Sequence, residues 1–169
     1  MTDGPPGRPS RRRPSPLVRL LLRAPAPLYR WRLGGVLGGR FLLLTHAGRR
    51  SGRLYRTPLE VLGPGSLPDE VLVLAGFGRD SDWVRNVRAG HAVEVAIGRR
   101  RFVPVWRELD ERAAADALAA YERRNRWIAP VVRRMLGRLA GWRYDGGPES
   151  RRRLVRRLPV LGFRPAGEG

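Results

Sequence analysis

The stretch that decides our interpretation of the fold is residues 42–61, LLLTHAGRRSGRLYRTPLEV. The apolar run Phe41–Thr45 leads into a turn of Gly, Arg and Ser, and a second apolar run, Tyr55–Leu62, follows with Pro58 near its start. Two apolar runs separated by a polar, glycine-containing loop are typical of a β-hairpin. We therefore predict a hairpin with an extended polar loop here.

The segments after this hairpin alternate between strand and helix patterns. Asp110 is predicted to cap the helix that begins at the next residue, because an aspartate side chain can accept the free N–H groups of a first helical turn. The order favours an α+β fold, a small antiparallel barrel crossed by a helix, over alternating βαβ units. The predicted elements are a strand over Val71–Ala75, a helix over Ser81–Ala89 capped by Ser81 or Asp80, a hairpin of Val93–Ile97 and Phe102–Arg107, helices over Glu111–Arg124, Ile128–Leu139 and Glu149–Leu158, and a last strand over Pro159–Phe163.

The N-terminal part has a different composition. Residues 1–16 are mostly Pro, Gly, Ser and Arg, which bury too little apolar surface to offset the entropy of ordering, so we predict a disordered basic tail. Apolar residues recur among Arg over 17–39, and Pro25 and Pro27 interrupt them, which predicts two short amphipathic helices. These helices can cap the barrel, or they can contact an anionic membrane through residues 17–37.

The length of 169 residues, 42% of them hydrophobic, fits one domain. The apolar run Leu17–Leu22 contains Arg19, so it is a poor export signal and too short to span a bilayer, and we expect a cytoplasmic protein, with the inner membrane face as an optional contact. We place the single domain at residues 17–165, with N-terminal helices in 17–39, the barrel and site motifs in 40–107, and a helical region with the last strand in 108–165.

The charge is large and comes from arginine alone. All 34 basic residues are Arg, and the formal net charge is +19. A field of that size attracts polyanions, but Lys and Gln are absent while Ala, Gly and Pro abound, which is typical of a high-GC genome. The arginines are also spread along the chain. We therefore expect no specific nucleic-acid recognition, and a basic module without chemistry that binds anionic membrane or nucleic acid remains the alternative from a different class.

Residue types also limit the chemistry. The chain has no Cys and only two His, His46 and His91, so neither a disulfide framework nor a typical zinc site is expected. Redox activity would need an organic cofactor. His46 adjoins the turn and can donate a proton, although a structural role fits it as well, and no residue is named as catalytic from spacing.

The turn itself offers the groups that bind anions. It combines flexible glycines, exposed backbone N–H groups, a hydroxyl and several guanidinium groups, which can hold a phosphate or carboxylate. A solvated loop in an Arg-rich protein fits the composition equally well. The residues concerned are Gly48, Arg49, Arg50, Ser51, Gly52 and Arg53.

A second candidate region follows the third strand. Gly76-Phe77-Gly78 has the spacing of neither a Walker loop nor a dinucleotide fingerprint, but it leads into a helix N-terminus at Ser81, which favours a polar ligand. Trp83 and Asn86 lie one turn apart on this helix and can face one site. The alternatives are core packing for Trp83 and a helix-surface amide for Asn86.

Three ordered stretches carry a resemblance to a known family: residues 42–61, then LVLAGFGRDSDWVRNVRAG (72–90), then VEVAIGRRRFVPVWREL (93–109). Together they resemble the deazaflavin (F420)-dependent nitroreductase and quinone reductase family. The resemblance implies an α+β fold with a small antiparallel split β-barrel of the FMN-binding type and helices at both ends. It covers residues 40–107.

The resemblance also implies a site. In that family the Arg-rich turn and the Pro-Leu strand after it, here Pro58 and Leu59, hold the phosphate-bearing tail of F420. The strand end before the helix meets the deazaflavin ring, and the Trp-x-x-Asn pair braces the site. The implied cofactor-binding residues are Gly48, Arg49, Arg50, Ser51, Gly52, Arg53, Arg56, Thr57, Pro58, Ala75, Gly76, Phe77, Trp83 and Asn86.

The implied activity is hydride transfer from reduced F420 to a small organic acceptor, a quinone, nitroaromatic or activated alkene, by a protein that can form a homodimer. FMN or haem is the alternative ligand within the same fold. Tyr55 stands where many members have a basic residue, which leaves open whether Arg53 or Arg56 reaches the tail. Helices also replace the family's substrate-facing segment, so for the acceptor side we name only Tyr121 or Trp127.

Overall fold

The computed structural model describes residues 38–167. The predicted tail over 1–16 and the predicted membrane contact of residues 17–37 lie outside these residues. So does nearly all of the segment 17–39 in which two helices were predicted, and its last residues form the 3-10 turn η2 (Gly38–Arg40).

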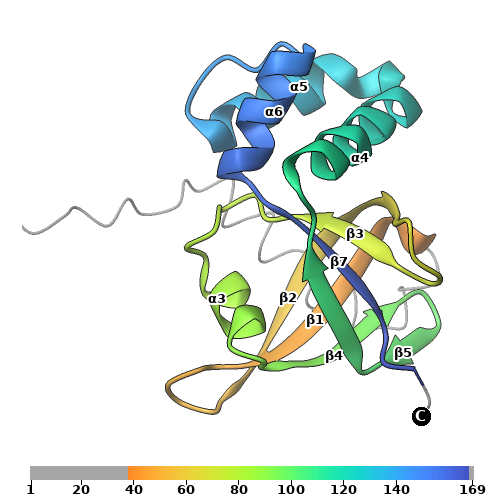
Figure 1. Cartoon of the computed structure of the whole chain (residues 1–169), viewed down its shortest axis with the longest axis vertical. Coiled ribbons are helices and arrows are strands. Elements are labelled where there is room, and N and C mark those ends of the chain that lie inside the picture. The colour runs from red at the N-terminus through yellow and green to blue at the C-terminus, as the bar shows by residue number, and fades with distance from the viewer. Residues whose placement is uncertain (1–37, 168–169) are drawn as a thin grey trace, which may run out of the picture.

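Within residues 38–167, seven strands form one antiparallel sheet in the order β5-β4-β1-β2-β3-β7-β6. The sheet curls into a nearly closed barrel, with the helix α3 (Asp82–Arg88) against one side (Figure 1). The predicted split-barrel fold of the α+β class is thus confirmed. The strands are β1 (Phe41–Ala47), β2 (Leu54–Pro64), β3 (Val71–Leu74), β4 (Ala92–Ile97), β5 (Arg100–Phe102), β6 (Pro104–Glu108) and β7 (Val160–Pro165).

Strand β2 belongs to both halves of the barrel. Its first part pairs with β1, so that Glu60 lies opposite Phe41, and its last part pairs with β3. The register shifts between Val61 and Gly63, and such an irregularity bends a strand and increases its twist. The predicted first hairpin is therefore correct, and its second strand is long enough to run along one whole side of the structure.

The predicted single strand Phe102–Arg107 is wrong in one respect, because it is two strands. β5 pairs with β4, as expected for the second hairpin, whereas β6 pairs with β7. The break falls at Val103, whose carbonyl accepts from Ala166 N and whose side chain is exposed. Pro104, which has no N–H for a sheet ladder, begins the second strand. The chain here crosses from one edge of the sheet to the other.

The barrel interior follows from alternation along the strands. Leu42 and Leu44 of β1 are fully buried, and α3 adds Val84 and Val87, also fully buried. Each such side chain contributes about 1.5–3 kcal/mol relative to an exposed position. This core fixes α3 against the barrel wall, so that two of its polar residues, Asp82 and Asn86, contact Arg49 of the β1–β2 turn.

A helical layer stands at one end of the barrel (Figure 1). It consists of α4 (Glu111–Arg124), the turn η3 (Arg126–Ile128), α5 (Ala129–Ala140) and α6 (Pro148–Arg157). The predicted helices and the last strand are confirmed, and so is the cap, because the Asp110 carboxylate accepts from Ala113 N at 2.8 Å. The layer has its own core, which includes Leu118, Leu136, Leu154 and Leu158.

Candidate functional site

A cavity of about 1100 Å³ lies where the barrel, α3 and the helical layer meet. The β1–β2 hairpin supplies its polar end, the loop after β3 and α3 supply one side, and α4 and α5 supply an apolar wall. Strand β2 contributes to the lining along most of its length, from Tyr55 to Leu62. Groups that are far apart on the chain therefore share one ligand-sized space.

The Arg-rich turn is a closed loop held by its glycines. Gly48 N donates to Arg53 O, and Gly52 N donates to Gly48 O, both at 2.8 Å. Gly52 has a φ of 65°, a left-handed conformation that favours glycine. A Cβ on Gly48 would lie 2.7 Å from Ser51 Oγ and 2.9 Å from the Tyr55 ring. This shape therefore favours glycine at positions 48 and 52.

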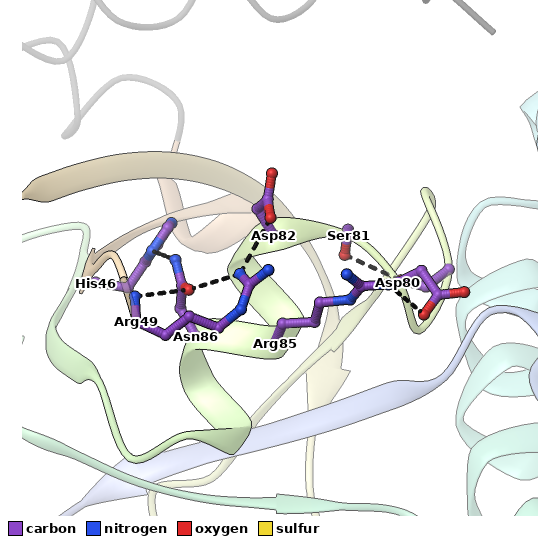
Figure 2. Close-up of polar contacts among 8 residues, drawn as sticks. His46, Arg49, Asp80, Ser81, Asp82, Arg85 and Asn86 are labelled. Atoms are coloured by element: carbon purple, nitrogen blue, oxygen red, sulfur yellow. Dashed lines mark hydrogen bonds and ion pairs between the residues drawn. The ribbon is translucent and has the colours of Figure 1, made fainter. Parts of the chain in front are cut away.

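Asn86 connects α3 to the turn. Its Oδ1 accepts from the backbone N of Arg49 at 3.2 Å and from the Arg49 guanidinium at 3.1 Å, and its Nδ2 donates to His46 Nδ1 at 3.0 Å (Figure 2). Asp82 pairs with the same guanidinium at 3.1 Å. Asn86 is 2% exposed, so the alternative of a helix-surface amide is wrong.

His46 is held on both ring nitrogens. Because Nδ1 accepts from Asn86, Nε2 carries the hydrogen and donates to Thr57 Oγ1 at 3.0 Å. Burial lowers the pKa of His46 below its usual 6.5, and the charge of Asp82 opposes this shift. The ring also stacks on Tyr55. A neutral His46 thus positions Asn86 and Thr57, which supports the structural alternative for this residue.

The loop after β3 and the start of α3 form the side of the cavity. Gly76 and Phe77 line it, and the Phe77 side chain is half exposed. Trp83 lines the cavity as well, but it also packs into the barrel core and is buried. Both interpretations of Trp83 therefore hold. Ala75 is fully buried and lies outside the lining.

The cavity gathers most of the predicted site. Gly52, Arg53 and Ala75 are the predicted residues that do not line it. Of the two arginines left open, Arg56 lines the cavity and Arg53 does not. For the acceptor side, Tyr121 lines the cavity, whereas Trp127 is 75% exposed and does not. The residues brought together are Gly48, Arg49, Arg50, Ser51, Arg56, Thr57, Pro58, Gly76, Phe77, Trp83 and Asn86.

Two parts of the lining were missed from the sequence. The first is Glu60, the partner of the predicted Tyr121, whose hydroxyl donates to Glu60 Oε1 at 2.7 Å. Burial, and then the Glu60 carboxylate, raise the pKa of Tyr121, so the phenol stays protonated. The second is the apolar wall of α4 and α5, whose periodic apolar residues were assigned only to packing. That wall consists of Leu118, Val132, Met135, Leu136 and Leu139.

The arginine end of the cavity and the Tyr121–Glu60 pair lie at different points along β2. Arg56 and Glu60 are separated by four strand residues, roughly 13 Å at the usual rise per residue. The cavity thus has cationic groups at one end, a protonated phenol beside a carboxylate further along, and an apolar wall between α4 and α5. Such a donor set, with the close-fitting Gly48 turn, fits a flat aromatic ligand that carries an anionic tail.

Comparisons with known proteins identify a family for this chain. The model of the F420H2-dependent quinone reductase family matches residues 27–135. Among solved structures, an F420-H2 dependent reductase, FDR-A, is 21% identical with a TM-score of 0.40, covering 74% of this chain and 94% of that one. A pyridoxamine 5'-phosphate oxidase-related, FMN-binding protein from Nostoc punctiforme is 14% identical with a TM-score of 0.40, covering 85% and 81%. No curated protein matches.

The family match spans more than half of the chain and includes the Arg-rich turn, α3 and the strands that hold them. It also reaches into α5, which supplies part of the apolar wall. The cofactor of the family is F420, and its reactions are reductions. The chain therefore belongs to the F420H2-dependent quinone reductase family.

Proposed function

We propose that this protein transfers a hydride from reduced F420 to a quinone, and that the cavity described above holds both molecules. The observation that carries the proposal is the distribution of charge, since three arginines line one end of a cavity whose opposite wall is apolar. Arg49, Arg50 and Arg56 would hold the phosphate-bearing tail, because guanidinium groups pair with phosphate through two parallel hydrogen bonds.

Of these three arginines, Arg49 has the side chain that is most firmly held before a ligand binds. Asn86 and Asp82 hold its guanidinium, and Asn86 also holds its backbone N. A side chain that is already ordered loses less entropy when it binds a ligand. Phe77, Gly76 and Trp83 would then border the ring system on the side of α3, as the family resemblance implies.

The acceptor side has the groups that a quinone needs. Bound F420H2 supplies the hydride. Reduction of a quinone to a hydroquinone also consumes a proton, and Tyr121 holds a proton in the cavity wall beside Glu60. The apolar wall of α4 and α5 excludes water and accepts an apolar ring or chain. Nitroaromatics and activated alkenes share the flat shape, but their reduction is not part of this proposal.

The test is a titration of F420 into the protein, followed by the fluorescence of both. Arg56→Gln should weaken binding about tenfold, the size expected for one hydrogen bond to a charged group. Arg53→Gln is the matched control, since it removes the same charge from the same hairpin without altering the cavity lining. Unchanged fluorescence, or equal effects of the two substitutions, would contradict the proposal.

FMN and haem serve as competing ligands in the same experiment. Purified protein incubated with each should show no bound chromophore in its absorption spectrum after gel filtration. Retention of FMN or haem in place of F420 would assign the cavity to that ligand. Steady-state reduction of a soluble quinone analogue by F420H2 then tests the acceptor separately from cofactor binding.

A further inference from the structure

An apolar stripe runs along the outer side of η3 and α5. Trp127, Val131 and Met135 are 75%, 68% and 37% exposed. Val131 and Met135 are four residues apart on α5 and therefore share one face of it, and Trp127 lies in η3, four residues before Val131. Val132 and Leu136 each follow a stripe residue by one position, so they lie on the adjacent face of α5, and they are buried. The stripe is therefore surplus to the packing of the helical layer.

The stripe lies in a segment with positive charge and no acidic residue. Residues 123–143 contain no Asp or Glu. Arg134 and Arg138 fall on the same helical face as the stripe, three residues from Val131 and from Met135. Long arginine side chains can extend past apolar neighbours and place their charge at a polar boundary. The arginines of the segment, all exposed, are Arg123, Arg124, Arg126, Arg133, Arg134, Arg138 and Arg143.

This surface adjoins the cavity. Met135 belongs to the exposed stripe and also lines the cavity, so it forms part of the rim. Leu139, one turn further along α5, lines the cavity too. A molecule that reaches the stripe is thus one side chain away from the apolar wall.

The chemistry of the surface selects its partner. A second copy of the chain docked symmetrically would bring these arginines against the same arginines, with no acidic residue in the segment to pair with them, which is repulsive. A nucleic acid would use the arginines but leave Trp127 and Val131 without a role. An anionic bilayer uses both, because arginines bind its phosphates while Trp and aliphatic side chains enter the headgroup region.

We propose that the outer face of η3 and α5, defined by Trp127, Val131, Met135, Arg134 and Arg138, docks on an anionic membrane surface. Within residues 38–167 no helix has the length and hydropathy to cross a bilayer, so the contact is peripheral. Docking places the Met135 rim at the lipid, from which a lipid-soluble quinone can enter the cavity. That last step rests on the function proposed above, whereas the membrane contact does not.

The test uses the full chain and sedimentation with vesicles, without F420 or quinone. Vesicles of equal phosphatidylcholine and phosphatidylglycerol should bind the protein, vesicles of phosphatidylcholine alone should not, and binding should weaken with salt. Val131→Ser should weaken binding about tenfold. Val103→Ser is the matched control, because Val103 lies on the barrel and is 64% exposed. This substitution should leave binding unchanged.

The contribution of the arginines and the depth to which Trp127 enters the lipid are tested with the same vesicles. Arg134→Gln with Arg138→Gln should weaken binding more than Arg99→Gln with Arg112→Gln, which removes equal charge elsewhere. Brominated lipids should quench wild-type fluorescence more than that of Trp127→Phe. Equal effects of Val131→Ser and Val103→Ser, or equal quenching of the two proteins, would overturn the proposal. So would Val131→Ser dissociating a dimer or weakening DNA binding.

The two proposals can fail separately. If the protein binds vesicles as described but neither binds F420 nor reduces a quinone, the function is wrong and the docking surface stands. If the protein reduces a soluble quinone but does not bind anionic vesicles, the docking surface is wrong and the function stands.

Discussion

The Asn86 side chain holds Arg49 at two points, since its single oxygen accepts from both the backbone N–H and the guanidinium of that residue. The other end of the amide is fixed by His46. One buried side chain on α3 thus sets both the path of the turn and the direction of a guanidinium that faces the cavity. Sequence spacing alone suggested only that Asn86 shares a face with Trp83.

Replacing Asn86 with Ala should weaken F420 binding at least tenfold and lower the free energy of unfolding by about 1–3 kcal/mol. The substitution leaves the part-buried backbone N–H of Arg49 and a buried acceptor on His46 without partners, and the Arg49 guanidinium keeps only Asp82, which costs about that much. Fluorescence titration and urea unfolding measure the two effects. Asn125→Ala is the control, because Asn125 Nδ2 bonds only the Tyr121 carbonyl of its own helix. If the Asn86 variant binds F420 with unaltered affinity, then F420 binding does not depend on Asn86 holding the Arg49 side chain.

Gly48→Ala should damage the turn without adding or removing charge. The new methyl group would meet Ser51 Oγ and the Tyr55 ring at distances that force one of them to move, and such overpacking costs about 1–3 kcal/mol. We expect weaker F420 binding with the helical layer unchanged by circular dichroism. Gly39→Ala adds the same methyl group where nothing lies within 4 Å. If both variants bind F420 like the wild type, the turn does not need its tight form.

Tyr121→Phe should reduce turnover of quinone and leave F420 affinity intact. The phenol is the protonated group that we place at the acceptor, and loss of a positioned proton donor lowers kcat by about 100-fold or more. Kinetics with a soluble quinone and F420 titration separate the two quantities. Tyr144→Phe removes another buried phenol that does not line the cavity. Equal kcat for the Tyr121 variant and the wild type would exclude a role in proton transfer.

Protonation of His46 should destabilise the fold. Its pKa in the folded state lies below 6.5, the value of the unfolded chain, so the unfolded state binds the proton first. The stabilising contribution is complete above pH 6.5 and is lost as the pH falls toward the lower folded pKa, by up to about 1.4 kcal/mol per pH unit. Urea unfolding between pH 4.5 and 6.5 measures this slope. His46→Gln should flatten it, and an unchanged slope would assign the effect to other groups.

Much of the barrel could be predicted because its local signals agree. The glycines of the turn, the alternation in β4 and the Asp110 cap all act within a few residues. The division of Phe102–Arg107 into β5 and β6 was missed although Pro104, which disfavours the interior of a strand, stands at the break. The break depends on which distant strand each half meets, namely β4 for the first half and β7 for the second.

The site, too, has a part that could be predicted from the sequence and a part that could not. Its anion-binding turn was visible because Gly and Arg occur together in a short loop, and the family resemblance added Trp83 and Asn86. The wall formed by Leu118, Met135 and Leu139 was not visible, since an apolar helix face looks the same whether it borders a cavity or a packed core. Glu60 was missed because a single acidic residue in a strand gives no sign of its partner, Tyr121, on a helix far along the chain.

The helical layer begins and ends at neighbouring points of the barrel. Strands β6 and β7 pair directly, and Leu109 N donates to Val160 O where the chain leaves and returns. The helical layer is thus an insertion between β6 and β7, and the pairing of these two strands holds its two ends side by side. A chimera in which the helical layer is replaced by that of a relative should therefore have a different apolar wall in the cavity. The strand register of the barrel and the Arg-rich turn should be unchanged. If the proposed function is correct, the segment that borders the quinone is therefore structurally separate from the part of the barrel that holds F420.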